Sequence, residues 1–279
     1  MSFFRIKIII LENIGNKTLF GLYFGPGNCI IKTHQFFGLR EGIMPIFSNL
    51  TGLFSSPETA VTIIIARLLI ATLILPFHEL AHGWVANKMG DPTAKWMGRL
   101  TLNPLKHIDP IGSVLMLITG FGWAKPVPIN PRNFKNERKG MAITAAAGPI
   151  ANFIMAFVLL ILAKLILIFY VLTDGAHWLY LIYSLVSRMV TINISLGVFN
   201  LCPIPPLDGY RIISLFLPDR IYYTIQQYEQ YILYGFMALL MLTDFIYTPI
   251  SYLSGLIANG LDFATGFMDL IIRALLGGA

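Results

Sequence analysis

The sequence predicts an all-α membrane protein, a polytopic bundle of about 4–6 transmembrane helices, because its apolar stretches are long enough to cross a bilayer. Of the 279 residues, 56% are hydrophobic and only 12% are charged. A soluble domain is about one quarter charged, so about half of the expected charge is missing. The mean hydropathy of +0.70 agrees with this reading. Composition therefore excludes an ordinary soluble domain.

Five apolar stretches are candidate spans, each near the length of about 20 residues that a membrane helix needs. They are residues 59–84, 141–172, 178–201, 230–250 and 254–276. The last contains three glycines, so it could either span or lie at the interface. Residues 57–279 are therefore predicted to form a transmembrane domain. Residues 1–56 have mixed composition, and we interpret them as an extramembrane or interfacial segment without an assigned function.

The loop between the first two spans is strongly basic. Residues 85–140 hold nine Lys and Arg against three Asp and Glu, which places the loop on the cytoplasmic side by the positive-inside rule. Within it, "DPIGSVLMLITGFGW" is apolar but too short to cross as a helix, and "WAKPVPIN" is typical of an irregular or edge strand. We expect a small re-entrant or β-like element here. The net charge of +6 then reflects membrane orientation, and nucleic acid is not an expected partner.

The predicted order of spans brings two polar motifs to one side of the cell membrane. The first span enters the cytoplasm at "FHELAHGW", the second leaves it, and the third returns at "NLCPIPPLDG". Both motifs therefore face the cytoplasmic side of a multi-pass protein.

The pattern H-E-x-x-H at residues 78–82 is typical of a zinc site. Residues four apart share a helix face, so His78 and His82 can offer their imidazoles to one metal ion. Glu79 lies at the edge of that face and can reach a water molecule as a general base. Zinc suits this chemistry because it lowers the pKa of bound water to about 7. Ionisable groups at membrane depth usually carry function, which favours the metal interpretation over two interfacial histidines.

Catalytic zinc needs a third protein ligand, and Asp208 is the best candidate. It follows three prolines in "CPIPPLDGY", which prevent a regular helix, and non-helical backbone at membrane depth is tolerated where it lines a cavity. The alternative is that Asp208 only caps the next helix. His107 is on the correct side but lies in a loop among charged residues. Cys202 is expected to be a small buried thiol rather than a ligand.

These motifs make the chain resemble the site-2 protease family of zinc intramembrane metalloproteases. "HELAH" matches the family's first motif, "NLCPIPPLDG" matches N-x-x-P-x-P-x-x-D-G, and "AAAGPIANF" matches G-P-x-x-N. The stretches "GDPTAKWMGRLTLNPLKHIDPIGS" and "GFGWAKPVPINPRNF" further resemble a compact bacterial branch that lacks a PDZ or CBS domain. Similarity covers about residues 58–215. The resemblance implies zinc as cofactor, held by His78, His82 and Asp208, with Glu79 as general base.

The resemblance also implies a reaction, namely hydrolysis of peptide bonds within or near transmembrane segments of membrane-protein substrates. Asn152 could hold the unwound substrate backbone or support the oxyanion, or it could pack helices through a hydrogen bond. The extended "WAKPVPIN" could pair with substrate as an added strand, or its prolines could simply blunt an edge.

A second class of function uses the same ligands without hydrolysis, in a zinc transporter or sensor. It would need further acidic or histidine ligands along a path through the bundle, and it leaves Glu79 without a task. An inactive scaffold that binds membrane helices is disfavoured, because every catalytic residue is present. The sequence does not name the substrate, the pathway, the regulation or the oligomeric state.

Overall fold

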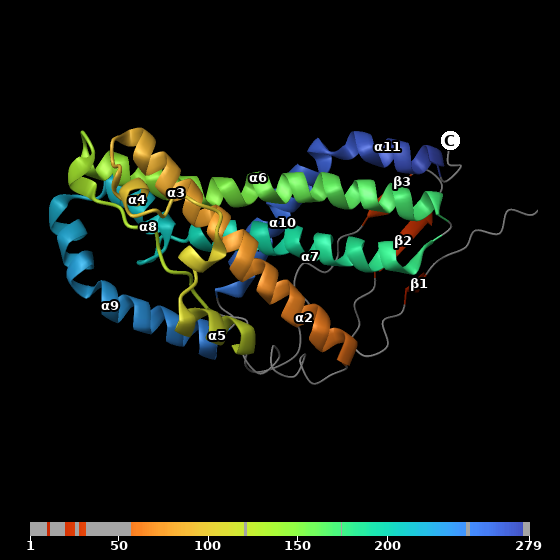
Figure 1. Ribbon diagram of the computed structural model, residues 1–279, viewed down its shortest axis with the longest axis horizontal. Helices are drawn as coiled ribbons and strands as arrows, with labels where there is room; N and C mark the ends of the chain where they lie inside the picture. Colours follow the sequence, from red (N-terminus) through yellow and green to blue (C-terminus); the bar gives the residue numbers. More distant parts are fainter. Residues whose placement is uncertain are drawn as a thin grey trace, which may run out of the picture.

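The computed structural model describes residues 10–11, 20–25, 28–31, 57–119, 122–173, 175–243 and 246–275. Within these ranges the protein is mainly helical, and long helices run along one direction (Figure 1). Three short strands, β1 (Ile10–Leu11), β2 (Phe20–Gly25) and β3 (Asn28–Ile31), form an antiparallel sheet in the order β1-β2-β3. The predicted extramembrane or interfacial character of residues 1–56 stays a prediction.

The first span is one continuous helical segment with a wider turn inside it. It consists of α2 (Pro57–Leu69), the π-helical turn η1 (Ile70–Ile74) and α3 (Leu75–Met89). Pro76 cannot donate a backbone hydrogen bond and crowds the preceding turn, and a π-turn is one way in which a helix absorbs such a residue. The helix ends at Gly90, whose φ of +110° is a left-handed conformation suited to glycine.

The second and third spans are α6 (Glu137–Leu172) and α7 (His177–Asn200), close to the predicted ranges. Asn136 caps α6 by accepting a hydrogen bond from Lys139 N at 2.9 Å. At 1.5 Å per residue, α6 is about 54 Å long, which exceeds the hydrocarbon core of about 30 Å. The helix α6 is therefore longer than an untilted span requires.

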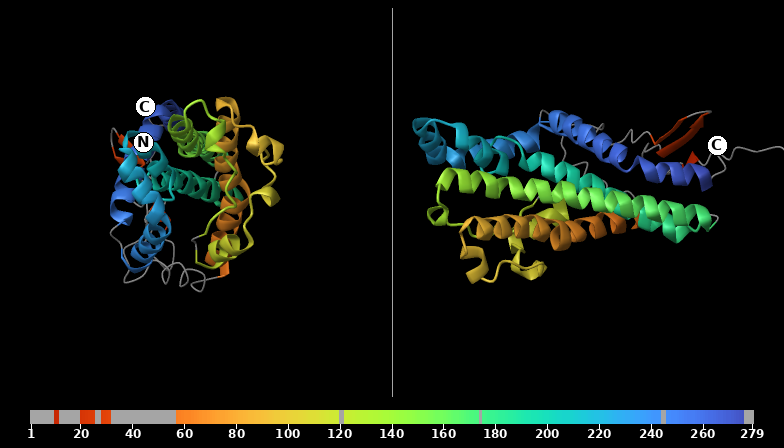
Figure 2. Two further views of the ribbon diagram at one scale, coloured as in Figure 1. Left: turned by 90° about the vertical axis from the view of Figure 1, so that its left-hand side faces the viewer. Right: turned by 90° about the horizontal axis from the view of Figure 1, so that it is seen from above.

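Short elements connect the first two spans, and Figure 2 shows residues 93–119 (yellow) on the opposite side of α3 from α6. They are α4 (Thr93–Trp96), η2 (Pro104–Lys106), α5 (Pro110–Thr119) and η3 (Pro131–Asn133). A single antiparallel bridge, Ile108 to Ala124, is the only pairing of this kind in the described residues of this loop. With ten residues, α5 is too short to cross a membrane. Whether it is re-entrant stays a prediction.

Two buried polar groups hold this connecting segment in place. Arg67 of α2 donates to the carbonyl oxygens of Leu117 (2.5 Å) and Ile118 (3.0 Å) at the end of α5. Asp91 is fully buried and accepts hydrogen bonds from Thr93, Asn130 and Asn133. Burial opposes ionisation of Asp91, but these hydrogen bonds outweigh it and hold the pKa of the carboxyl below its usual range.

The C-terminal part contains α8 (Asp208–Ile213), η4 (Ser214–Phe216), α9 (Asp219–Leu242), α10 (Tyr247–Ala264) and α11 (Gly266–Leu275). The predicted span over 230–250 is wrong in its bounds, because α9 ends at Leu242 and α10 begins at Tyr247. The helices α10 and α11 are bent by 61° at their junction. By length and composition, the described residues supply three spanning helices, or four if this bent pair is one span. The all-α membrane class is confirmed, whereas the predicted number of spans and the β-like element stay predictions.

Candidate metal centre

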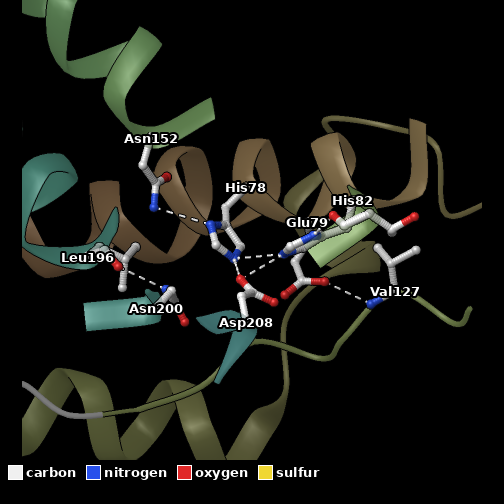
Figure 3. A network of polar contacts seen from close by, with 9 residues as sticks. His78, Glu79, His82, Val127, Asn152, Leu196, Asn200 and Asp208 are labelled. Atoms are coloured by element: carbon white, nitrogen blue, oxygen red, sulfur yellow. Dashed lines mark hydrogen bonds and ion pairs between the residues drawn. The ribbon is translucent and has the colours of Figure 1, made fainter. Parts of the chain in front are cut away.

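The two histidines of "HELAH" lie on one face of α3 and point to the same place (Figure 3). Their Nε2 atoms are 3.0 Å apart, and their rings are nearly perpendicular at 85°. Both side chains are buried, with 5% and 6% of their surface exposed. The helix therefore presents two imidazole nitrogens to one point, as the four-residue spacing predicts.

Asp208 reaches the same point from a distant part of the chain. Its Oδ2 lies 3.3 Å from His78 Nε2 and 3.2 Å from His82 Nε2. Asp208 is the first residue of α8, whose N-cap position is Leu207, and no side chain caps this helix start. The capping alternative for Asp208 thus finds no support in the geometry. One ligand atom from each of His78, His82 and Asp208 lies within 4.8 Å of the others.

Two glycines allow close packing around the centre, one in α6 and one in α8. A Cβ at Gly148 of α6 would lie 2.3 Å from His82 Nε2 and 2.5 Å from His78 Cε1. A Cβ at Gly209 would lie 2.1 Å from the carbonyl oxygen of Leu201. Either side chain would collide with its neighbours, so the absence of a Cβ lets α6 pack on the histidines and lets α8 start beside the end of α7.

The outer nitrogens of both imidazoles bond to α6. His82 Nδ1 lies 2.8 Å from the carbonyl oxygen of Thr144 and must donate to it. His78 Nδ1 lies 3.1 Å from the side-chain amide of Asn152, which is fully buried. The contacting atom of Asn152 is its amide nitrogen, which donates to His78 Nδ1. Thr144, Gly148 and Asn152 are four residues apart and form one stripe of α6.

The contact with Thr144 leaves the inner nitrogen of the neutral His82 ring as a lone-pair donor. The Nε2 atoms of both rings face the Asp208 carboxylate. Asp208 Oδ2 is buried and receives no well-formed hydrogen bond from any described residue. One ligand-type atom from each of the three residues converges on a single point, where a cation could be held by all three. A set of two histidines and one carboxylate fits zinc.

Glu79 lies next to His78 in the chain, but its carboxylate is not one of the three converging ligand groups. Its Oε2 accepts a hydrogen bond from the backbone N–H of Val127 at 2.8 Å, and Figure 3 shows the carboxylate turned toward that residue. Val127 belongs to the extended stretch "WAKPVPIN", so this loop contacts the first motif directly. The backbone groups of Val127 and Thr144 were not predicted, because a main-chain donor or acceptor leaves no mark on residue type.

The other candidate ligands lie elsewhere. His107 is buried, and its Nε2 donates to the carbonyl oxygen of Thr101 at 2.8 Å. The Cys202 thiol contacts the carbonyl oxygen of Val198 at 3.9 Å, in agreement with a packing role. His34 lies outside the described residues. Among the described groups of His, Cys, Asp and Glu, the set of His78, His82 and Asp208 is the one that converges on a single point.

Fold and site together define a class: a helical membrane protein with a His–His–Asp group that could bind a metal ion. Comparison with known sequences gives the family. Residues 162–243 match the model of "Peptidase family M50". The chain is 45% identical to "Putative zinc metalloprotease YwhC" of Bacillus subtilis over 176 residues, which are 62% of this chain and 78% of that protein. The chain therefore belongs to peptidase family M50, the site-2 proteases, and it is a zinc metalloendopeptidase.

More distant relatives carry similar names. "Putative zinc metalloprotease Rip2" of Mycolicibacterium smegmatis is 31% identical over 49% of this chain and 51% of its own length. "Zinc metalloprotease MJ0392" of Methanocaldococcus jannaschii is 30% identical over 55% of this chain and 34% of its own length. No solved structure gives a significant match. The predictions of the family, of a peptidase acting on protein substrates and of a zinc cofactor are confirmed.

Proposed function

We propose that the protein is an intramembrane endopeptidase that cleaves within or near transmembrane segments of membrane-protein substrates. The position of the centre carries this proposal. His78 lies near the middle of Ile63–Met89, a helix long and apolar enough to span. Its partners come from α6 and from the start of α8, so the scissile bond must reach a site inside the bundle. A peptidase centre at such depth suits a substrate that is itself in the membrane.

Zinc would be held by His78, His82 and Asp208, where it supplies a Lewis acid that polarises the scissile carbonyl and makes water nucleophilic at neutral pH. Glu79 acts as general base: its carboxylate takes a proton from the attacking water and passes it to the leaving amine. Because Oε2 is bonded to Val127 N–H, Oε1 is the oxygen left to accept the proton.

Residues of α6 orient the ligands. Thr144 and Asn152 bond to the outer nitrogens of His82 and His78, and such partners hold a ligand imidazole in one tautomer and one orientation. We therefore assign Asn152 first to orienting His78. Its role in holding substrate stays a prediction, because its amide is buried against the histidine.

The cytoplasmic side is proposed for the active site. The basic bias of residues 85–140 supports a cytoplasmic position for the end of α3, and water would reach the centre from there. The transporter or sensor alternative receives no support from the late helices. Their acidic side chains Asp262 and Asp269 are paired with Lys164 at 2.8 Å each and do not extend a path of ligands.

The test compares the wild type with Glu79→Gln in detergent on a single-span model substrate, with zinc content measured in parallel. Glu79→Gln should lower cleavage at least about 100-fold, the lower limit for a lost general base, while about one zinc per chain is retained. Glu137→Gln, an exposed glutamate at the start of α6, is the matched control and should cleave normally. Equal cleavage by wild type and Glu79→Gln would overturn the mechanism.

A further inference from the structure

The loop segments that contain Arg99 and "KPVPIN" have no role in the mechanism described so far, although Val127 of the second segment contacts Glu79. Arg99 is 7% exposed, and no acidic side chain among the described residues pairs with it. A buried charge is costly unless its hydrogen bonds are satisfied. Its Nη2 donates to the carbonyl oxygens of Lys125 at 2.7 Å and Pro126 at 3.2 Å. Arg99 therefore holds backbone of the extended stretch.

The peptide group between Pro126 and Val127 is bonded at both ends. Its carbonyl oxygen accepts from Arg99, and its N–H donates to Glu79 Oε2 at 2.8 Å. Arg99 and Glu79 are thus linked as guanidinium, peptide and carboxylate. Hydrogen bonds in such a chain polarise one another, so the Arg99 cation strengthens the donor that Glu79 uses.

The prolines make this donor unique in its stretch. Pro126 and Pro128 lack an N–H, so Val127 provides the one backbone donor of residues 126–128. The Val127 side chain is 6% exposed and packs close to Gly83 of α3, where a Cβ would lie 3.0 Å from it. This packing aims the Val127 N–H at the turn of α3 that carries Glu79.

Both sides of the stretch are anchored. Lys125 N donates to the carbonyl oxygen of His107 at 2.7 Å, and Asn130 N donates to buried Asp91 at 2.7 Å. With its neighbours fixed, the peptide plane at 126–127 has little freedom, and Arg99 sets its remaining orientation.

We propose that Arg99 is a positioning residue that acts through the Pro126–Val127 peptide to hold the Glu79 carboxylate in place for proton transfer. The proposal rests on the role of Glu79 proposed above. In this role, Arg99 contacts neither the metal ligands nor the substrate. Its loss should therefore lower the rate of the chemical step and leave zinc binding and substrate affinity unchanged.

The kinetic test uses Arg99→Met, with Arg99→Lys as the conservative variant and Lys95→Met as a control that removes an exposed charge from the same loop. On the single-span model substrate, Arg99→Met should lower kcat about tenfold, the lower end for an outer partner of an active site. KM and zinc content should match the wild type, Arg99→Lys should recover part of kcat, and Lys95→Met should have no effect. A kcat for Arg99→Met within twofold of wild type, or a loss of zinc with it, would overturn the proposal.

A backbone substitution tests the link without touching Arg99. Replacement of Val127 by α-hydroxyisovaleric acid exchanges its N–H for an ester oxygen and should also lower kcat about tenfold at unchanged zinc content. This variant decides the matter if Arg99→Met does not fold. Combined with Arg99→Met or Arg99→Lys, the ester should add little further loss, since both act on one bond. Losses that multiply would contradict the link.

A spectroscopic readout is independent of activity. Pro126–Val127 is the one Pro–Val pair in the chain, so ¹³C-carbonyl proline with ¹⁵N-valine marks this single amide in an NMR spectrum. Its resonance should move in both Arg99→Met and Glu79→Gln and stay in place in Lys95→Met. Cleavage by Glu79→Gln at the wild-type rate would refute the general-base role itself. An inactive Glu79→Gln beside unaffected Arg99→Met and ester variants would refute only the inference on Arg99.

Discussion

Two polar clusters lie within the helical bundle, and they balance charge in opposite ways. Lys164 of α6 is 3% exposed and lies 2.8 Å from both Asp262 and Asp269, so the chain supplies its own cation. At the other cluster, nitrogens of His78 and His82 face the Asp208 carboxylate, and no Lys or Arg among the described residues is paired with it.

The difference separates structure from function. Polar groups at membrane depth are costly unless they are paired. The Lys164 cluster meets this requirement by itself and ties α6 to the bent pair α10–α11. The histidine cluster has no such cationic side chain among the described residues, and its three groups could hold a metal ion. Pairing with a lysine is typical of a structural site, whereas the convergence of two imidazoles and a carboxylate is typical of a metal site.

We expect the largest effect on zinc affinity from Asp208→Asn, with Asp269→Asn in the Lys164 cluster as the matched control. Asp208→Asn removes a ligand and should lower zinc affinity more than about 100-fold, beyond the range for outer-shell partners, with loss of peptidase activity. Asp269→Asn makes the same chemical change in the Lys164 cluster and should retain about one zinc per chain. Chelator competition measures both. Retention of zinc by Asp208→Asn would break the assignment.

Gly148→Ala should have the next largest effect on zinc affinity. The new Cβ would overlap His82 Nε2 and His78 Cε1, and overpacking of this kind costs about 1–3 kcal/mol. Because the imidazoles must move, we expect up to about 100-fold weaker zinc binding. Gly235→Ala is the control, since its Cβ would meet nothing within 4 Å. Normal zinc affinity in Gly148→Ala would show that the histidines tolerate displacement.

Asn152→Ala should have a smaller effect, about tenfold on zinc affinity, because it removes only the partner that orients His78. Asn193→Ala is the matched control: Asn193 is equally buried, but it bonds to the carbonyl oxygen of Met189 within α7. If Asn152→Ala keeps wild-type zinc affinity and raises only KM, the predicted contact with substrate would replace the orienting role.

Lys164→Met should have the smallest effect on zinc, within about twofold, and a large effect on stability. It leaves two aspartates without their cation, and removal of one partner of a buried pair costs about 3–5 kcal/mol. Partial exposure of Asp262 brings the expected loss to the lower end of about 3 kcal/mol. Unfolding by denaturing detergent measures it. Lys164→Met/Asp269→Asn should recover part of the loss, and zinc loss in Lys164→Met would show that the clusters are coupled.

Much of the site could be predicted from local pattern. The spacing of His78 and His82 on one helix face depends only on helix geometry, and apolar length predicted the bounds of α6 and α7 closely. The motif "PIPPLDG" indicated Asp208 because its prolines exclude a helix. The bounds near residues 243–246 were not predictable, since hydropathy continues across the break between α9 and α10.

By itself, the sequence determined the membrane class and singled out the two histidines, the aspartate and the glutamate of the candidate site, because residue type and short spacing carry that information. The tertiary structure alone decided which groups surround them: the Thr144 carbonyl on His82, Asn152 on His78, and the Val127 N–H on Glu79. Two of these three are backbone atoms that every residue possesses. Their roles arise from the packing of α6 and the 124–130 stretch against α3, over sequence distances at which no local pattern acts.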